Sequence, residues 1–121
     1  MIYLNEEHKE RYKILIKKSG MIYEDRERKA LFHLLAGNSD LYKQVDKIYD
    51  FNRQQLCCMT GYGQVDFSNI YTSSSSKSLL LLAIQLYNNG TDITVAESFR
   101  YLDAGTAQIA LVAIKIRYNI N

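Results

Sequence analysis

The chain contains no proline among its 121 residues. Proline breaks helices because its ring clashes with the preceding turn and it lacks a backbone N–H. Without proline, the ends of helices are marked by glycine, serine, asparagine and aspartate. Hydrophobic residues make up 47% of the chain and charged residues 23%, as in ordinary globular proteins. We therefore expect unbroken helices in a single globular domain that spans residues 1–121.

Cap residues and apolar spacing predict five to six helices. The first is expected over residues 6–19, because Asn5 is a good N-cap and Gly20 suits the left-handed position after the last turn. Apolar residues repeat at helical spacing after the other candidate caps. Further helices are expected over residues 24–36, from Ser39 to about residue 47, from the serine run at 73–76 to residue 88, from the Thr94–Glu97 capping box to about residue 101, and from Asp103 to the basic residues near position 117.

The last predicted helix carries a continuous apolar segment, Ile109–Ile114, with apolar side chains on every side. A helix that is apolar all round is normally buried. The helix before it is also rich in leucine. We therefore expect these last two long helices to form the centre of the domain.

Residues 50–73 show no helical period. The Gly61-Tyr62-Gly63 sequence lacks the third glycine of a phosphate-binding loop and predicts a turn. A short strand or hairpin around Tyr49–Phe51 or Gln64–Tyr71 is an open alternative. Irregular segments longer than about 12–15 residues are uncommon in compact domains and are usually functional or mobile. The predicted fold is a mainly all-α, compact bundle with one long irregular loop, and this loop is a candidate binding site.

Charge and hydropathy exclude several classes of protein. The longest apolar runs, Leu79–Ile84 and Ile109–Ile114, are far shorter than the ~20 residues that span a bilayer. The N-terminal segment mixes acidic and basic residues, unlike a secretory signal. The net charge is only +2, with both signs interleaved, whereas duplex binders cluster one sign on a face. We expect a cytoplasmic protein with no membrane partner, and nucleic-acid binding is less favoured than protein binding.

The two cysteines, Cys57 and Cys58, are adjacent, and neighbouring cysteines rarely form a disulfide. Together with His8 and His33 they do not match a common zinc-binding spacing. We expect two reduced thiols, no metal site and no cofactor. His8 is expected to be solvated on the first helix. His33 is expected to be a hydrogen-bonded histidine of the core or its boundary.

The serine run contains Ser74–Lys77, which fits the S-x-x-K pattern of penicillin-binding acyltransferases. The S-D-N and K-T-G partners of that pattern are absent, and no Ser–His–Asp or Cys–His arrangement is evident, so we expect no catalytic activity. Serines at the start of a helix more often cap free N–H groups, and with a lysine such an end can also attract an anion. The candidate anion-binding residues are Ser74, Ser75, Ser76 and Lys77.

The chain has 10 tyrosines and no tryptophan. Tyrosine and arginine often anchor protein interfaces. Tyr49, Tyr62 and Tyr71 lie in or beside the irregular loop, where they either contact a partner or close the core over the loop. We take Tyr62 and Tyr71 as candidate partner-binding residues.

The charged start of the second helix is the other candidate surface. It is either an exposed interface or a set of internal ion pairs at i,i+4 spacing, Glu24 with Arg28 and Asp25 with Lys29. Arginine favours an interface because its planar fork matches carboxylates and phosphates. The candidate partner-binding residues of this surface are Asp25, Arg26, Arg28 and Lys29.

Five strings cover most of the chain apart from the loop at 52–72. They are NEEHKERY near the start, DRERKALFHLLAGN at 25–38, LYKQVDKIYDF at 41–51, LLLLAIQLYN after the serine run, and AIKIRYNIN at the end. Together they resemble a family of small proteins from Gram-positive bacteria and their phages that has no assigned function.

This resemblance implies a small intracellular accessory protein of phage or prophage origin. Phage accessory proteins of this size often act by binding a host protein, so a host protein is the expected partner. Inhibition of a bacterial defence nuclease, as by an anti-CRISPR protein, is the sharpest form of that expectation. The alternative is a nucleic-acid-binding or regulatory module that uses the basic end of the second helix. No oligomeric state is predicted.

Overall fold

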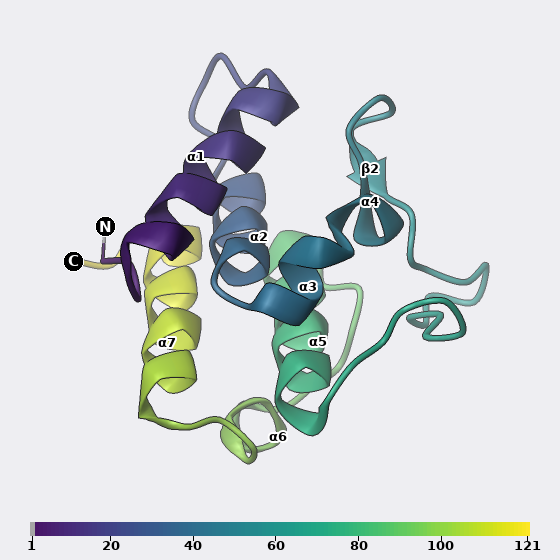
Figure 1. The fold of residues 1–121 in the computed structure, drawn as a ribbon. Coiled ribbons are helices and arrows are strands. Elements are labelled where there is room, and N and C mark those ends of the chain that lie inside the picture. Colours follow the sequence, from purple (N-terminus) through teal and green to yellow (C-terminus); the bar gives the residue numbers. More distant parts are fainter. Residues whose placement is uncertain (1) are drawn as a thin grey trace.

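Seven helices and one two-stranded sheet make up residues 2–121, the part of the chain that the computed structural model describes (Figure 1). The mainly helical fold is confirmed. No helix in this part of the chain has the length and apolar character needed to cross a membrane. The elements are α1 (Glu6–Ser19), α2 (Arg26–Ala36), α3 (Ser39–Lys43), α4 (Val45–Ile48), β1 (Tyr49–Asp50), β2 (Gln55–Leu56), α5 (Ser74–Asn88), α6 (Val95–Phe99) and α7 (Ala104–Tyr118).

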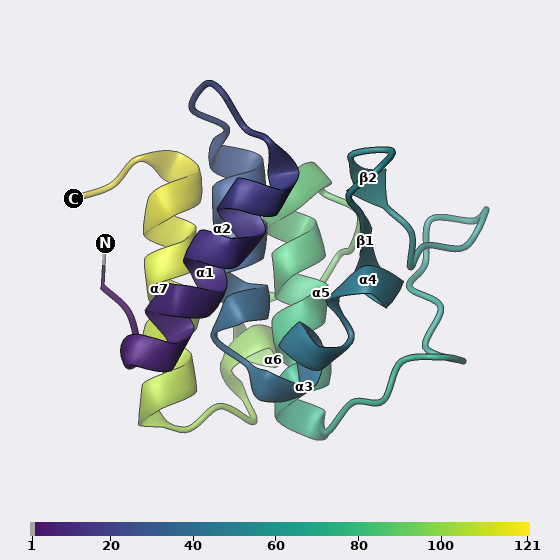
Figure 2. The same ribbon diagram turned by 45° about the horizontal axis from the view of Figure 1, so that its top comes forward.

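Helix α2 forms the centre of the core. Every side chain from Ala30 to Ala36 is buried, and α1, α5 and α7 all pack against this helix. Figures 1 and 2 show α7 and α5 on either side of α2. The prediction that the last two long helices are central is therefore wrong for α7. The uninterrupted apolar half of α2 can be covered on all sides only if the other helices surround it.

Helix α7 lies at the edge of the bundle. Its composition predicts burial on every side, but the helix is buried on one side only. Its buried residues are Ile109, Ala110, Val112 and Ala113, whereas Leu111 between them is 41% exposed. Its helical neighbours α2 and α5 cover one side of it (Figure 2). One face of the apolar segment of this helix therefore reaches the surface.

Local caps set most helix boundaries as predicted. Helix α1 spans the expected residues: the Asn5 side chain accepts a hydrogen bond from the His8 N–H, and Gly20 adopts φ 66°. The predicted capping box of Thr94 and Glu97 starts α6, and Asp103 caps α7. These boundaries depend on contacts over three residues, so a sequence is enough to find them.

Two helix starts differ from the predictions. Helix α2 begins at Arg26, because Asp25 is extended and its carboxylate accepts the Arg28 N–H at 3.0 Å. Asn38, and not Ser39, caps the next helix. The predicted third helix is divided in two, because Gln44 has the non-helical angles φ −111° and ψ 17°.

A short hairpin follows α4. Tyr49 pairs with Leu56 and Asp50 with Gln55, which confirms the first of the two hairpin positions considered. At the second position, the pairing found among the described residues is an isolated bridge between Met59 and Val65. Tyr49 is fully buried, with its ring edge-on to Phe32 at 5.3 Å between ring centroids. This tyrosine closes the core and is not available to a partner.

Candidate functional site

The long loop, residues 57–73, is tied to the α3–α4 segment by polar contacts. Gln44 accepts a hydrogen bond from the Tyr71 N–H at 2.7 Å and donates one to the carbonyl of the same residue at 2.8 Å. Lys47 donates to the Asn69 carbonyl at 3.1 Å. These contacts fix residues 69–71 against the helices. This end of the loop therefore presents its side chains from a defined position.

Two tyrosines project from the long loop. Tyr62 lies at the tip of the turn closed by the Thr60 N–H, which donates to the Gln64 carbonyl. Gly63 in this turn adopts φ 75°, which glycine tolerates because it has no Cβ, and the predicted turn is confirmed. The side chains of Tyr62 and Tyr71 are 95% and 71% exposed. Both therefore have the exposure that the partner-binding hypothesis requires.

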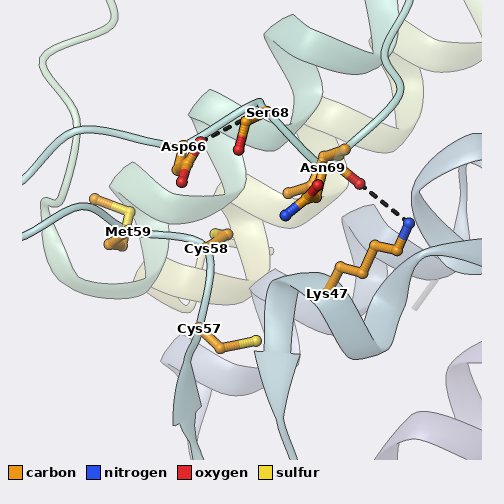
Figure 3. Close-up of a pocket in the computed structure, with 8 residues that line it drawn as sticks. Lys47, Cys57, Cys58, Met59, Asp66, Ser68 and Asn69 are labelled. Atoms are coloured by element: carbon orange, nitrogen blue, oxygen red, sulfur yellow. Dashed lines mark hydrogen bonds between the residues drawn. The ribbon is translucent and has the colours of Figure 1, made fainter.

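The base of the long loop forms a pocket of about 410 Å³ (Figure 3). Asp66, Ser68 and Asn69 lie on one segment of the loop, and the cysteines and Met59 lie on the other. Lys47 reaches across from α4 to the Asn69 carbonyl. Pockets of about 300–1,000 Å³ typically hold small ligands. The lining residues are Lys47, Cys57, Cys58, Met59, Asp66, Ser68, Asn69 and Ile70.

The ionisable groups of this pocket suit binding better than covalent catalysis. Hydrogen bonds from the side chain and backbone of Ser68 lower the pKa of Asp66, which is therefore an anion at neutral pH. Burial and the nearby carboxylates of Asp50 and Asp46 raise the pKa of the Cys57 thiol. Burial and Cys57 raise the pKa of Cys58 to about 11. Both thiols are therefore protonated at neutral pH, whereas the thiolate is the nucleophile and the metal ligand.

The sequence did not single out the polar residues of this pocket. Lys47 belongs to a helix, and Asp66 and Asn69 come from an unpatterned stretch that folds back onto it. A local sequence pattern could have indicated only an Asx turn, in which the Asp66 side chain accepts the Ser68 N–H at 2.9 Å. Within residues 2–121, no three His, Cys, Asp or Glu side chains are grouped so that they could hold a metal ion.

The charged start of α2 is largely engaged in internal contacts. The Arg28 guanidinium donates to Asp25 at 2.7 Å and to Gln54 at 2.7 Å. Lys29 pairs with Glu24 at 3.4 Å. The charged residues thus form internal ion pairs, with the partners exchanged relative to the predicted i,i+4 pairs. Arg26 is the exposed member of the four candidate residues.

The serine run is a helix cap. Ser73 accepts the Ser76 N–H at 3.2 Å, and the buried Ser76 hydroxyl accepts the Ser73 N–H at 2.8 Å. The structure places Ser74, an exposed residue, and Lys77 in a second hollow, of about 300 Å³, together with Arg100 and Tyr101, which the sequence did not connect with them. The Lys77 ammonium lies 5.0 Å from the centre of the Phe67 ring. The candidate anion-binding residues therefore do not act as one cluster, because Ser76 faces the protein interior.

Both histidines are buried, and the prediction that His8 is solvated is wrong. His8 Nδ1 accepts the Leu4 N–H at 2.9 Å, so its Nε2–H donates to the His33 carbonyl at 2.9 Å. The two rings lie 4.5 Å apart between centroids. His33 is in the core as predicted, but its two ring nitrogens have no hydrogen-bond partner among the described residues. Burial lowers the pKa of both side chains, with that of His33 falling to about 3.

Fold and site together define a small helical domain that carries a polar pocket and two exposed tyrosines on one anchored loop. The chain belongs to the DUF6075 family, a family of unknown function whose model matches residues 1–121. No curated protein and no solved structure matches the chain.

Proposed function

We propose that this protein is a non-catalytic binding protein that recognises a protein partner through its long loop. One observation carries the proposal: Tyr62 and Tyr71 are exposed on a loop whose backbone is held to the helices by Gln44 and Lys47. Tyrosine supplies a large contact area at low entropic cost, because few of its bonds rotate. A loop that is already ordered loses less entropy when it binds.

The pocket at the base of the long loop supports the same function. It offers an anion at Asp66, a cation at Lys47 and the polar side chains of Ser68 and Asn69 around apolar residues. Such a pocket can receive one or two side chains of a partner while the tyrosines cover the surface beside it. Buried anchors in pockets are where interface energy concentrates.

The proposed biological setting is a bacterial cell that carries this protein on a phage or prophage. Its support is the resemblance of five sequence strings to small proteins of Gram-positive bacteria and their phages. In this setting the partner is a cytoplasmic host protein, and a CRISPR or other defence nuclease is the sharpest candidate. A nucleic-acid-binding role has weaker support, because Arg28 and Lys29 are paired with carboxylates.

Capture from host lysate tests the proposal. The parent protein, the double variant Tyr62→Ala with Tyr71→Ala, and the control Tyr23→Ala are immobilised, and retained proteins are quantified by mass spectrometry. Tyr23 is a suitable control because it is 68% exposed but lies in the turn between α1 and α2. We expect a protein that is retained by the parent and the control and lost from the double variant. Equal retention by all three would place the interface elsewhere.

Salt dependence separates the two kinds of partner. Phosphate contacts make the logarithm of the binding constant fall steeply with the logarithm of the salt concentration. An interface built on tyrosines responds less, because its energy comes mainly from apolar contact. We expect a shallow salt dependence for the captured protein. Retention of nucleic acid that disappears at moderate salt and depends on Arg26 would favour the alternative.

A further inference from the structure

The outward face of α7 is unusual for a helix at the edge of a bundle. Helix α7 contains no acidic residue. Ala104, Gln108, Leu111 and Tyr118 are exposed, and their spacing of four, three and seven residues keeps them on one stripe. Leu111 is the middle residue of the helix and the most apolar position of this stripe. The sequence predicts that this face of α7 is buried, but in the structure it is exposed.

A row of exposed aliphatic side chains runs beside this stripe. Leu4 and Ile2 line a hollow of about 220 Å³ with Gly105 and Gln108. Ile2 also lines the next hollow, of about 380 Å³, together with Ile120 and the C-terminal half of α7. Figures 1 and 2 both show the two ends of the chain beside α7. Each of the three aliphatic side chains, Leu4, Ile2 and Ile120, has about half or more of its surface exposed.

The order of this row along α7 is fixed by its neighbours. Leu4 lies at the N-terminal end, where a Cβ on Gly105 would come within 3.2 Å of a Leu4 methyl group. Ile2 lies near the middle, since it borders both hollows. Ile120 lies at the C-terminal end, next to Ile116. The row is therefore nearly symmetric about the level of Leu111.

We propose that this face of α7 binds a second copy of the chain, with the two α7 helices antiparallel and a two-fold axis passing Leu111. In this arrangement Leu111 meets Leu111 of the second copy. Ile2 lies near Ile2 of the second copy, and Leu4 faces Ile120. An isologous dimer requires a surface that complements itself in this way, whereas an unrelated partner places no such requirement on it.

The charges on this face favour the antiparallel dimer. Asp103 stands at the N-terminal end of α7, and hydrogen bonds from Thr106 keep it ionised by lowering its pKa. The cation Lys115 stands at the other end, where it lines the hollow with Ile2 and Ile120, whereas Arg117 is engaged with Glu27 and the Leu86 carbonyl. Antiparallel packing brings the Asp103 end of each helix beside the cationic end of the other and opposes the two helix dipoles. The two copies of Lys115 are then offset by eight residues, about 12 Å along the axis, so they do not repel one another closely.

Analytical ultracentrifugation tests the dimer. We expect the parent to sediment as a dimer and Leu111→Glu to sediment as a monomer. Ile14→Glu is the matched control, because Ile14 is an exposed aliphatic residue of α1 that lines neither hollow beside α7, and this variant should remain a dimer. A parent that is monomeric at every concentration overturns the proposal. A dimer that survives Leu111→Glu, or that Ile14→Glu also dissociates, overturns it as well.

Disulfide trapping tests the geometry and does not depend on introducing a charge. In a Cys57→Ser background, Leu111→Cys lies near the two-fold axis and should form a disulfide between two copies under mild oxidation. Ala104→Cys is displaced from its own copy by 14 residues, about 21 Å, in the antiparallel arrangement and should not. Cross-linking through Ala104→Cys would indicate parallel helices, and no cross-linking through Leu111→Cys would exclude this interface.

Discussion

The buried half of α2 and the long loop are held in place mainly by different kinds of contact. From Ala30 to Ala36 the helix is fixed by apolar contacts with three other helices, and no side chain reaches the surface. The long loop contributes only Cys58 and Ile70 to the buried core among its described residues. Hydrogen bonds with Gln44 and Lys47 hold its backbone, and Tyr62 and Tyr71 are exposed. Apolar packing is strong but leaves nothing exposed. A few polar contacts are weaker but leave side chains free for recognition.

The two regions should therefore respond differently to substitution. Substitutions in the core should destabilise the fold. They should leave partner binding intact only in variants that still fold. Changes at the loop contacts should act on the loop and leave folding nearly intact. Four predictions follow this order, from the largest expected effect to the smallest.

The strongest test introduces a charge into the core. Ala113→Asp places a carboxylate on the buried side of α7, where Arg117, the cation one turn away, is already paired with Glu27. Burying an unpaired charge is among the most destabilising single changes, and we expect a loss of more than about 4 kcal/mol in the free energy of unfolding. Urea denaturation followed by circular dichroism measures it.

The matched control is Ala104→Asp. Ala104 is exposed at the first turn of the same helix, where the helix dipole favours an acidic residue. We expect its stability to lie within about 0.5 kcal/mol of the parent. If Ala113→Asp is as stable as this control, α7 does not pack on α2 as the structure has it.

The second test uses pH, because the core contains the chain's two histidines. Burial takes the pKa of His33 to about 3, so His33 is neutral in the folded protein at pH 6, and burial also lowers the pKa of His8. In the unfolded chain both take up protons near their ordinary pKa of 6.5. The unfolded state thus binds more protons as the pH falls below 6.5, and the folded state loses stability. The expected loss approaches about 1.4 kcal/mol per pH unit for His33 below its unfolded pKa, and His8 adds to it in the same direction.

His33→Leu isolates one of these histidines. It removes a buried ring whose nitrogens have no hydrogen-bond partner among the described residues, so stability at pH 7.5 should be unchanged or higher. The slope of stability against pH between 6.5 and 5 should fall, because only the contribution of His8 remains. Urea midpoints at several pH values give both quantities. A parent whose stability is constant from pH 7.5 to 5 would contradict the buried pair.

The third test releases the long loop without disturbing the core. Gln44→Ala removes both hydrogen bonds to Tyr71, and we expect a loss of about 1 kcal/mol in global stability. Hydrogen exchange should become faster at residues 69–71 and stay unchanged in α7. Gln44→Glu keeps an acceptor for the Tyr71 N–H but loses the donor, so its exchange should be intermediate. Unchanged exchange in Gln44→Ala would mean that other contacts hold the loop.

The smallest effect is expected at the cysteines. Cys57 is exposed and Cys58 is buried beside the pocket, and both are free thiols. Cys57→Ser should leave the melting temperature and partner capture unchanged, and adding Cys58→Ser should lower stability only modestly, since a small buried thiol is replaced by a hydroxyl. Differential scanning fluorimetry and the lysate capture measure the two properties. Stoichiometric zinc in the parent that is lost from the double variant would show that the thiols are ligands.

The helices and most of their ends could be predicted from the local sequence. Asn5, the Thr94–Glu97 pair and Asp103 act on N–H groups at most three residues away, so their effect does not depend on the rest of the fold. The turn at Gly61-Tyr62-Gly63 followed from local glycine chemistry.

Contacts between distant segments determine which helix lies at the centre, which residues form the site and which face is exposed. The contact between His8 and His33 spans 25 residues, that between Arg28 and Gln54 spans 26, and that between Gln44 and Tyr71 spans 27. Apolar composition made α5 and α7 the candidates for the centre, and only the packing of four helices placed α2 inside and Leu111 of α7 at the surface. A sequence pattern fixes which face of a helix is apolar, whereas the neighbour that covers this face depends on distances between residues far apart in the chain.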